Sequence, residues 1–588
     1  MRRKNKQITT YFILFSLLLI GVIYAILQAN LQINGTAKIK ANTWNIYFNN
    51  IQVNPNSVSI NAGYQAATII DDTTITFAVD LAYPGDFYEF TVDVVNSGTI
   101  DGMISDISSK INDVEITTLP AYLNYKVTYS SGAEIKAKQV LRASTQETIK
   151  IRVEILRDIE VEDLPSSEQD LIISFELNYA QADDTAIEVS HIMPVLTEGL
   201  IPVTIANDGT VTAISKNDSN WFNYKTKQWA NAVLVTETNR STYRSIADGV
   251  GNNTTIPASD ILAYYVWIPR YSYKIWTLDT NSNHQGQEQT IDIKFVSSET
   301  KETGSIVGEY YTHPAFTFGE EELLGFWAGK FETTGTSFTP TILSNSSPLL
   351  GQNTSGEFAS SLIPAGGTQS GSTITFTGNN TYGLTSVADS HMMKNSEWGA
   401  VAYLSHSIYG INGEIRSNNY YNNGAYKTGC GASTINSSTS TSCEIVFGNA
   451  SSYPQSTTGN ISGIFDMSGG VLEDVMGNYD GLIGSSGFTS LPDNKYINIY
   501  PATVFTGSIG TNITFCTIST CGGHALNETS NWYSNNTYFI DSSSQWVTRG
   551  DDISWAGPQH SGLFGYTCGD GINMGASIAW RSVLVARE

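Results

Sequence analysis

The stretch GIFDMSGGVLED, residues 463–474, sets two carboxylates, Asp466 and Glu473, around a pair of glycines. Glycine permits a positive φ and brings bare carbonyl oxygens close to whatever occupies the turn. Carboxylate and carbonyl oxygens at irregular loop spacing are the ligands that a hard cation such as calcium prefers. The spacing alone favours a glycine-rich turn with solvated acids, and a metal site is the alternative interpretation.

An uncharged, mostly apolar run over residues 8–29 follows four basic residues among the first six. This pattern predicts that residues 1–30 are a signal peptide or a membrane anchor and that the rest of the chain is exported. Ala25 and Ala29 offer small residues to a signal peptidase, but the run is also long enough to span a bilayer. We therefore expect an extracellular or cell-surface protein whose N-terminal segment is either cleaved or kept in the membrane.

The 588 residues carry a formal net charge of −24 at pH 7. A surface of this charge repels phosphate backbones, so we expect no nucleic-acid partner. The seven histidines are scattered, without the HExxH or HxH spacing that indicates zinc or iron.

All five cysteines lie in the last third of the chain. Cys430 and Cys443 bracket one polar loop, and Cys516 and Cys521 bracket another, which in an exported protein predicts two disulfides. Cys568 is left over. A buried free thiol is the preferred interpretation for it, and a reactive or intermolecular thiol is the alternative.

Apolar and polar residues alternate in several runs of residues 31–182, notably over 74–81, 88–94, 149–155 and 173–179. Half-buried antiparallel strands at this density predict a β-sandwich. The stretches NGTAKIKANTW (34–44) and PGDFYEFTVDVVNSGTID (84–101), placed after an apolar segment, resemble the β-sandwich domains of camelysin-type surface and biofilm-fibre proteins of Gram-positive bacteria. The resemblance implies a spacer or matrix-associated role and supplies no catalytic residue.

Residues 183–259 are predicted to be a polar connector that holds one aromatic island, over residues 221–233. Burial against a neighbouring domain is the preferred interpretation of the island, and a sugar-stacking platform is the alternative. Residues 260–588 are rich in Ser, Thr, Asn and Gly, which predicts long loops, limited strand and a helix over 396–404. The whole chain is expected to be mainly β, with an α+β C-terminal domain.

Four landmarks follow one another in this last unit: FWAGKFETT (326–334), NSEWGAVAYL (395–404), GIFDMSGGVLED (463–474), and RGDD (549–552) with WRSVLV (580–585). Their order resembles the successive signatures of the formylglycine-generating, sulfatase-modifying-factor family. The resemblance implies a C-type-lectin-like fold for residues 260–588.

In that family the glycine-rich motif helps to hold a structural calcium ion. The resemblance therefore implies side-chain ligands from Asp466 and Glu473 and backbone carbonyl ligands from Gly469 and Val471. The usual asparagine and tryptophan of the motif are replaced here by Gly470 and Leu472.

Family members that oxidise a sulfatase cysteine use two cysteines, separated by four residues, shortly after the RG motif, where thiolates bind copper. Here no cysteine follows Arg549 before Cys568, and Cys516 and Cys521 precede the motif. The sequence therefore predicts no catalytic residues. An oxidoreductase of the formylglycine-generating type, acting on a protein cysteine, is the competing hypothesis.

The leading hypothesis is a bacterial cell-surface protein that displays a noncatalytic domain for adhesion to an extracellular glycan or protein. Loops carried on a rigid scaffold are where recognition usually resides. The candidate ligand-binding residues come from the C-terminal loop and a supporting tryptophan: Trp546, Trp555, His560, Phe564 and Tyr566. A purely structural surface-layer component is a further alternative, and it predicts self-association without a ligand.

Overall fold

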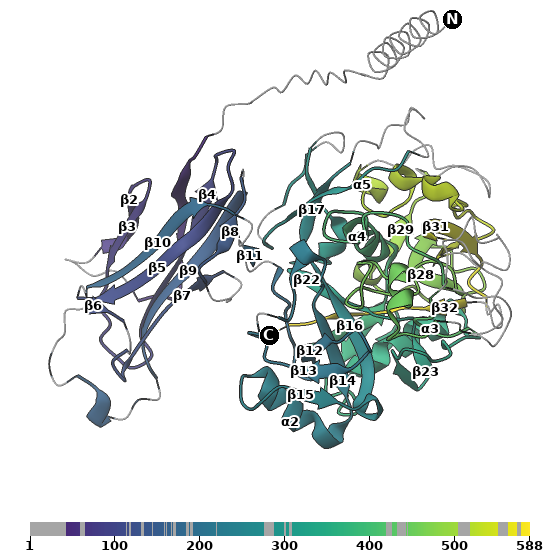
Figure 1. Ribbon diagram of the computed structural model, residues 1–588, viewed down its shortest axis with the longest axis horizontal. Helices are drawn as coiled ribbons and strands as arrows, with labels where there is room; N and C mark the ends of the chain where they lie inside the picture. Colours follow the sequence, from purple (N-terminus) through teal and green to yellow (C-terminus); the bar gives the residue numbers. More distant parts are fainter. Residues whose placement is uncertain are drawn as a thin grey trace, which may run out of the picture.

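The computed structural model describes residues 43–587 except 59–64, 113, 117–118, 131–134, 144, 158, 160, 166, 168–171, 184–186, 189–191, 219, 276–286, 299–300, 305–308, 419–425, 432–442, 444, 504–517, 551–561 and 573–577. Within these residues the chain is mainly β, as predicted, and forms two lobes that lie side by side in Figure 1. The predicted leader, residues 1–30, lies outside the described residues. Among the described helices, none has the length and apolar character needed to cross a membrane.

The N-terminal lobe, purple to blue in Figure 1, contains two facing sheets and a hairpin. One sheet has the strand order β1-β4-β9-β7, and the other has the order β10-β5-β8-β11 with β6 beside β5. The strands are β1 (Ile46–Val53), β4 (Phe87–Asn96), β9 (Thr145–Ile155), β7 (Leu123–Tyr129), β10 (Ile173–Gln181), β5 (Gly102–Ile111), β8 (Gln139–Leu141), β11 (Ile187–Glu188) and β6 (Val114–Glu115), with β2 (Gln65–Asp71) and β3 (Thr74–Ala78) in the hairpin.

One apolar core fills the space between the two sheets, because alternate side chains of a strand point to the same face. Tyr88 and Phe90 of β4 and Ile151 of β9 are buried in this core, and Phe175 and Leu177 of β10 pack against it from the other sheet. The strands predicted from alternation over 88–94, 149–155 and 173–179 are confirmed.

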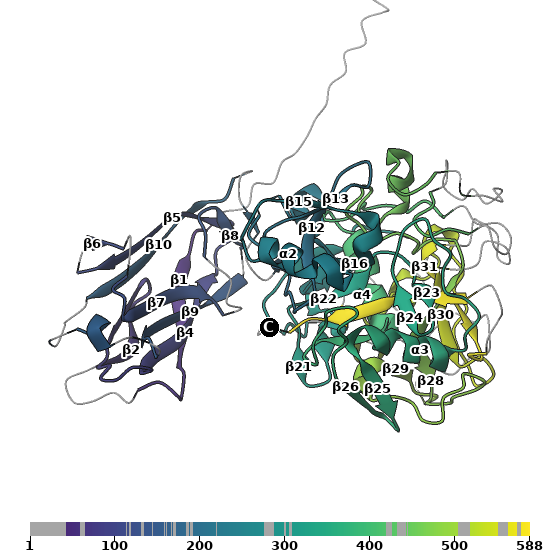
Figure 2. The ribbon, with the colours of Figure 1, turned by 90° about the horizontal axis from the view of Figure 1, so that it is seen from below.

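The C-terminal lobe is built on an eight-stranded sheet with the order β15-β13-β12-β14-β16-β22-β33-β27. Its strands are β15 (Thr254–Ile256), β13 (Val211–Ala213), β12 (Ile201–Ile205), β14 (Asn231–Val235), β16 (Ile261–Pro269), β22 (Gly325–Gly329), β33 (Ser582–Val585) and β27 (Asp389–Met392). The yellow C-terminal strand β33 therefore lies among strands from much earlier in the chain, which Figure 2 shows from below.

Residues 183–259 differ from the predicted polar connector, since four strands of this sheet come from them. Each of these strands has only three to five residues, so their apolar pattern is short and is broken by polar turns. The aromatic island is buried, with Trp221 2 % and Trp229 0 % exposed. The indole Nε1 of Trp229 donates to the carbonyl oxygen of Tyr409 at 2.8 Å. Burial of the island is thus confirmed, but it is buried in the core of its own lobe and not against a neighbouring domain.

Helix α4 (Asn395–Ser405) covers the second landmark, and a second, five-stranded sheet holds the end of the third landmark and Arg549–Gly550 of the fourth. FWAGKFETT begins on β22 and WRSVLV ends on β33, both in the eight-stranded sheet. The five-stranded sheet has the order β29-β28-β30-β31, with β32 also paired to β28. Its strands are β29 (Asn498–Tyr500), β28 (Leu472–Tyr479), β30 (Trp546–Gly550), β31 (Gly562–Gly569) and β32 (Ile578–Trp580). The helix predicted over 396–404 is confirmed as α4, and every residue of α4 is buried rather than one face only.

The other elements are short, and among them α2 packs against β12 and β13 and α3 against β27. The helices are α2 (Glu237–Ala247), α3 (Thr354–Leu362) and α5 (Ile518–Cys521), and the strands are β17 (Tyr271–Lys274), β18 (Asp292–Phe295), β19 (Tyr311–Thr312), β20 (Thr317–Phe318), β21 (Glu321–Glu322), β23 (Thr334–Thr336), β24 (Thr339–Thr341), β25 (Gly367–Ser370) and β26 (Thr373–Phe376).

Candidate functional site

Asp466, the first acid of the glycine-rich stretch, is fully buried and has a left-handed backbone conformation with φ of 68°. Its carboxylate accepts hydrogen bonds from Asn418 Nδ2 at 2.7 Å, from the N–H of Gly429 at 2.8 Å and from Gln455 Nε2 at 3.0 Å. Burial raises the pKa of Asp466, and the hydrogen bond from Gln455 is the largest effect that opposes the rise. The spacing alone favoured a solvated acid. Asp466 is instead buried, and its hydrogen bonds join distant loops.

Glu473, the second acid, forms a buried ion pair with Arg581 of the WRSVLV landmark. Arg581 Nη2 donates to Glu473 Oε1 at 2.6 Å, and Arg581 Nε donates to Oε2 at 3.0 Å. The same guanidinium donates to the carbonyl oxygens of Gly329 at 2.9 Å and Phe465 at 3.0 Å. Burial raises the pKa of Glu473 to about 7, although the charge of Arg581 opposes this. The pair ties the third landmark to the first and the last.

Glu332, from the FWAGKFETT landmark, adds a third carboxylate that the sequence analysis did not single out. It is fully buried, and neither carboxylate oxygen has a hydrogen-bond partner of ordinary geometry among the described residues. Burial raises the pKa of Glu332 well above its ordinary value, and the charges of Glu473 and Asp466 raise it further, against the smaller opposing effects of Arg581 and Tyr426. Three buried acids thus lie near one guanidinium, and burial together with the two neighbouring charges favours the protonated form of Glu332.

This cluster predicts that the protein loses stability as pH rises. Because the pKa of Glu332 is higher in the folded chain than in the unfolded one, the folded state holds more protons above about pH 4.5. The free energy of unfolding then falls as pH rises towards the folded pKa. We expect Glu332→Gln to match the wild type near pH 5 and to exceed it by about 1 kcal/mol or more at pH 8.

Urea unfolding of both proteins at the two pH values measures this difference. The exposed Glu320→Gln variant is the matched control, and it should follow the wild type at both pH values. A Glu332→Gln protein that is less stable than the wild type at pH 8 would show that the carboxylate is ionised and needed there.

The predicted calcium ligands are close in sequence, but the two carboxylates among them are already engaged in the fold. The carboxylate of Asp466 is taken by N–H donors and that of Glu473 by Arg581. Gly469 donates its N–H to the carbonyl oxygen of Gly550 at 3.2 Å, and Val471 is buried against Tyr426. This donor set does not fit a calcium ion, which would have to displace a guanidinium. The sequence pattern predicts calcium at this loop and the carboxylate contacts predict none, so the two expectations are separated by measuring binding.

From this arrangement we expect calcium to leave the melting temperature unchanged. The melt of the full-length protein is compared in about 5 mM calcium and in chelator, because extracellular calcium modules bind in the range of about 0.1–1 mM. A rise of several degrees with calcium, lost in Asp466→Asn, would contradict this expectation and restore the calcium assignment.

The remaining landmarks meet in the same interior. Arg549 of the RG motif donates from Nε to Asn395 Oδ1 at 2.7 Å and from Nη2 to the carbonyl oxygen of His524 at 2.6 Å. Trp398 Nε1 donates to the carbonyl oxygen of Leu563 at 2.9 Å. Burial lowers the pKa of Arg549 to about 10. We call these buried residues of the four landmarks, together with the Glu332–Asp466–Glu473–Arg581 cluster, the landmark frame.

The candidate ligand-binding aromatics belong to the core instead of the surface. Trp546 and Tyr566 are 0 % and Phe564 is 1 % exposed. Trp546 stacks on Phe488 at 5.5 Å between ring centroids, and the guanidinium of Arg549 lies 5.2 Å from the ring centre of Tyr566. As folded, these three side chains cannot stack on a ligand. The other two candidates, Trp555 and His560, lie outside the described residues.

The cysteines follow the predicted pairing where the structure describes them. Cys430 and Cys443 are joined by a disulfide. Cys521 is also disulfide-bonded, and Cys516 lies outside the described residues. Cys568 is a free thiol, and burial raises its pKa to about 11. A high pKa leaves little thiolate at neutral pH, so the unreactive interpretation of this cysteine is favoured.

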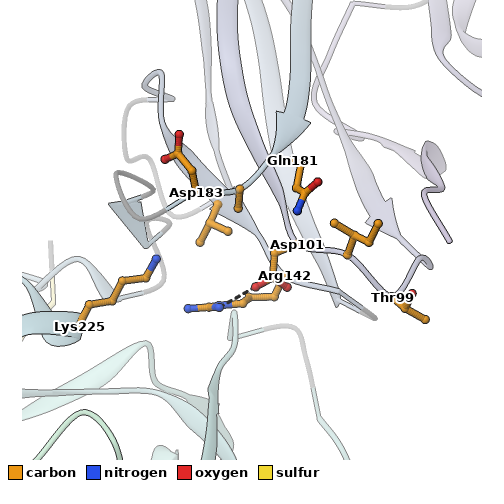
Figure 3. Close-up of a pocket in the computed structure, with 9 residues that line it drawn as sticks. Thr99, Asp101, Arg142, Gln181, Asp183 and Lys225 are labelled. Carbon is orange, nitrogen blue, oxygen red and sulfur yellow. Dashed lines mark hydrogen bonds and ion pairs between the residues drawn. The ribbon is translucent and has the colours of Figure 1, made fainter. Parts of the chain in front are cut away.

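A pocket of about 370 Å³ lies between the two lobes. Figure 3 shows Asp101, Arg142 and Asp183 of the N-terminal lobe on one side and Lys225 of the C-terminal lobe reaching towards them. Arg142 Nη1 donates to Asp101 Oδ2 at 2.7 Å, and the pair is about one third exposed. Balanced charges from both lobes suit a joint between them, and we assign the pocket to that joint.

Comparison of the chain with family models and with curated proteins finds no match to either.

Proposed function

We propose that this protein is an exported bacterial cell-surface protein in which a β-sandwich carries a noncatalytic, C-type-lectin-like domain for adhesion to an extracellular ligand. The observation that carries the proposal is the landmark frame. Three of its charged groups, Arg549, Arg581 and Glu473, are buried and bonded to one another, to the Asn395 side chain or to backbone carbonyls. Buried charged groups that are bonded in this way stabilise a rigid scaffold, and ligand recognition is then expected in the loops that surround it.

Three further features support the same function. The acidic composition and the predicted leader suit life outside the cell. A disulfide between Cys430 and Cys443 suits an oxidising environment. The N-terminal lobe is a separate layered body beside the C-terminal lobe, which suits a spacer that presents it (Figure 1).

Retention of the full-length protein on glycan arrays, on host cells and on extracellular matrix proteins tests the proposal. We expect specific, saturable retention on one of these surfaces and no oxygen consumption with copper and a cysteine-containing peptide. Turnover of the peptide that is abolished by Cys568→Ser would favour the oxidoreductase instead. Self-association into polymers without retention on any surface would favour a structural surface-layer component.

A further inference from the structure

A groove on the C-terminal lobe has walls that suit a sugar. It lies between helix α3, the hairpin β25–β26 and the loop 487–490 that follows β28, a region seen at the lower right of Figure 2. Its volume is about 480 Å³, which is within the range of small-molecule sites. We propose that this groove binds an uncharged glycan, an inference that rests on the proposed role of the lobe in adhesion.

The polar lining of the groove is neutral. Its polar side chains are those of Ser355, Thr368, Gln369, Thr489 and Ser490, and no charged side chain is among the described residues that line it. Hydroxyl and amide groups both donate and accept hydrogen bonds, which matches the hydroxyl groups of a sugar. A protein of net charge −24 repels anions, and the groove offers no carboxylate to pair with a cation.

Gln369 holds two walls of the groove together. Its Nε2 donates to the carbonyl oxygens of Gly371 at 2.9 Å and Ser490 at 3.1 Å, which joins the hairpin to the loop. These bonds use both amide hydrogens, so the amide oxygen is the part of Gln369 that can accept from a ligand. The N–H of Ser355 donates to the carbonyl oxygen of Ser486 at 3.0 Å and ties α3 to the same loop. Walls fixed before binding reduce the ordering cost of binding.

Glycines line the groove at positions where its walls approach closely, and a larger residue there would collide with a neighbouring side chain. At Gly487, where φ is +81°, an added Cβ would lie 2.2 Å from Asn353 Nδ2. At Gly367 it would lie 2.6 Å from the ring of Phe376. The apolar base is formed by Leu362 and Phe488, both buried. Trp546, predicted to bind ligand itself, stacks beneath Phe488 and supports this base.

The test uses immobilised neutral tetrasaccharides of glucose, galactose and N-acetylglucosamine, beside sialylated and sulfated glycans, with the full-length protein. We expect retention on at least one neutral glycan and none on the charged ones. Thr368→Trp and Thr489→Trp, both at exposed positions, should each weaken that binding at least tenfold without changing the melting temperature. Thr255→Trp, at an exposed position on the edge strand β15 of the eight-stranded sheet, is the matched control and should bind like the wild type.

The outcomes separate the groove from the proposed function. Retention only on charged glycans or on proteins would contradict binding of a neutral glycan in the groove, but it would still support the proposed role in adhesion. Equal binding by the wild type and both tryptophan variants would place the ligand elsewhere and overturn the groove as well. Absence of retention on every glycan and cell surface would overturn the adhesion function together with the inference.

Discussion

Replacing Arg581 with alanine is expected to destabilise the protein by about 3–5 kcal/mol, because it removes the partner of a buried charge. Arg581 Nη2 forms an ion pair with Glu473 Oε1 at 2.6 Å, and Asp466 and Glu332 lie in the same cluster. All four side chains are buried. Without the guanidinium, the carbonyl oxygens of Gly329 and Phe465 also lose their donors. Urea unfolding followed by tryptophan fluorescence measures the loss.

Two matched variants show whether charge is the cause. The double variant Arg581→Met/Glu473→Gln removes both charges of the ion pair and should recover a large part of the stability. In the single variant Glu473 stays buried without its partner, whereas in the double variant neither charge is present. Arg587→Met removes an exposed pair, with Glu321 at 2.8 Å, and should cost about 0–1 kcal/mol. A loss below about 1 kcal/mol in Arg581→Ala, or a double variant as unstable as the single one, would contradict the role of the ion pair.

A chain that starts at residue 260 is expected not to fold, whereas one that starts at residue 191 is expected to fold like the intact C-terminal lobe. The shorter chain lacks β12–β15, so the buried strand β16 becomes an open edge of the sheet. It also lacks Trp221 and Trp229, and burial of one such side chain is worth about 3–5 kcal/mol. Two of them approach the whole stability of a typical domain, about 5–15 kcal/mol.

Size-exclusion chromatography, near-ultraviolet circular dichroism and thermal melts of the two fragments measure this difference. The 191–588 fragment keeps Val195, whose carbonyl oxygen accepts from Trp327 Nε1 at 2.7 Å. It should be monodisperse and melt cooperatively, and the 260–588 fragment should aggregate or show no tertiary signal. Cooperative melting of the 260–588 fragment would show that residues 191–259 are a separable connector after all.

Short-range sequence patterns correctly predicted individual strands, one helix and one disulfide, because each of these depends on residues that are close in the chain. The alternation in residues 88–94 and 149–155 has a period of two, and both runs are strands. The apolar spacing in residues 396–404 has a helical period, and α4 covers it. Cys430 and Cys443 bracket a short polar loop, so their pairing needed little more than proximity in the chain.

The candidate site was harder to predict because its residues come from distant segments. Glu332, Glu473 and Arg581 are far apart in sequence, and only the pairing of β28 with β32 and of β22 with β33 brings them together. Exposure of an aromatic side chain is also not visible in sequence. Trp546 and Phe564 have the composition of a binding surface, but their strands lie inside the lobe.

Three features could be inferred from the amino-acid sequence: the mainly β character of the chain, the bond between Cys430 and Cys443, and the two acids that flank the glycine pair in residues 463–474. The folded chain was needed to see that residues 201–256 complete the C-terminal sheet and that Arg581 and Glu332 share an interior with those acids. This is because side-chain periodicity reports which face of a segment is apolar. It does not report which distant segment covers that face, and burial and charge pairing depend on that neighbour.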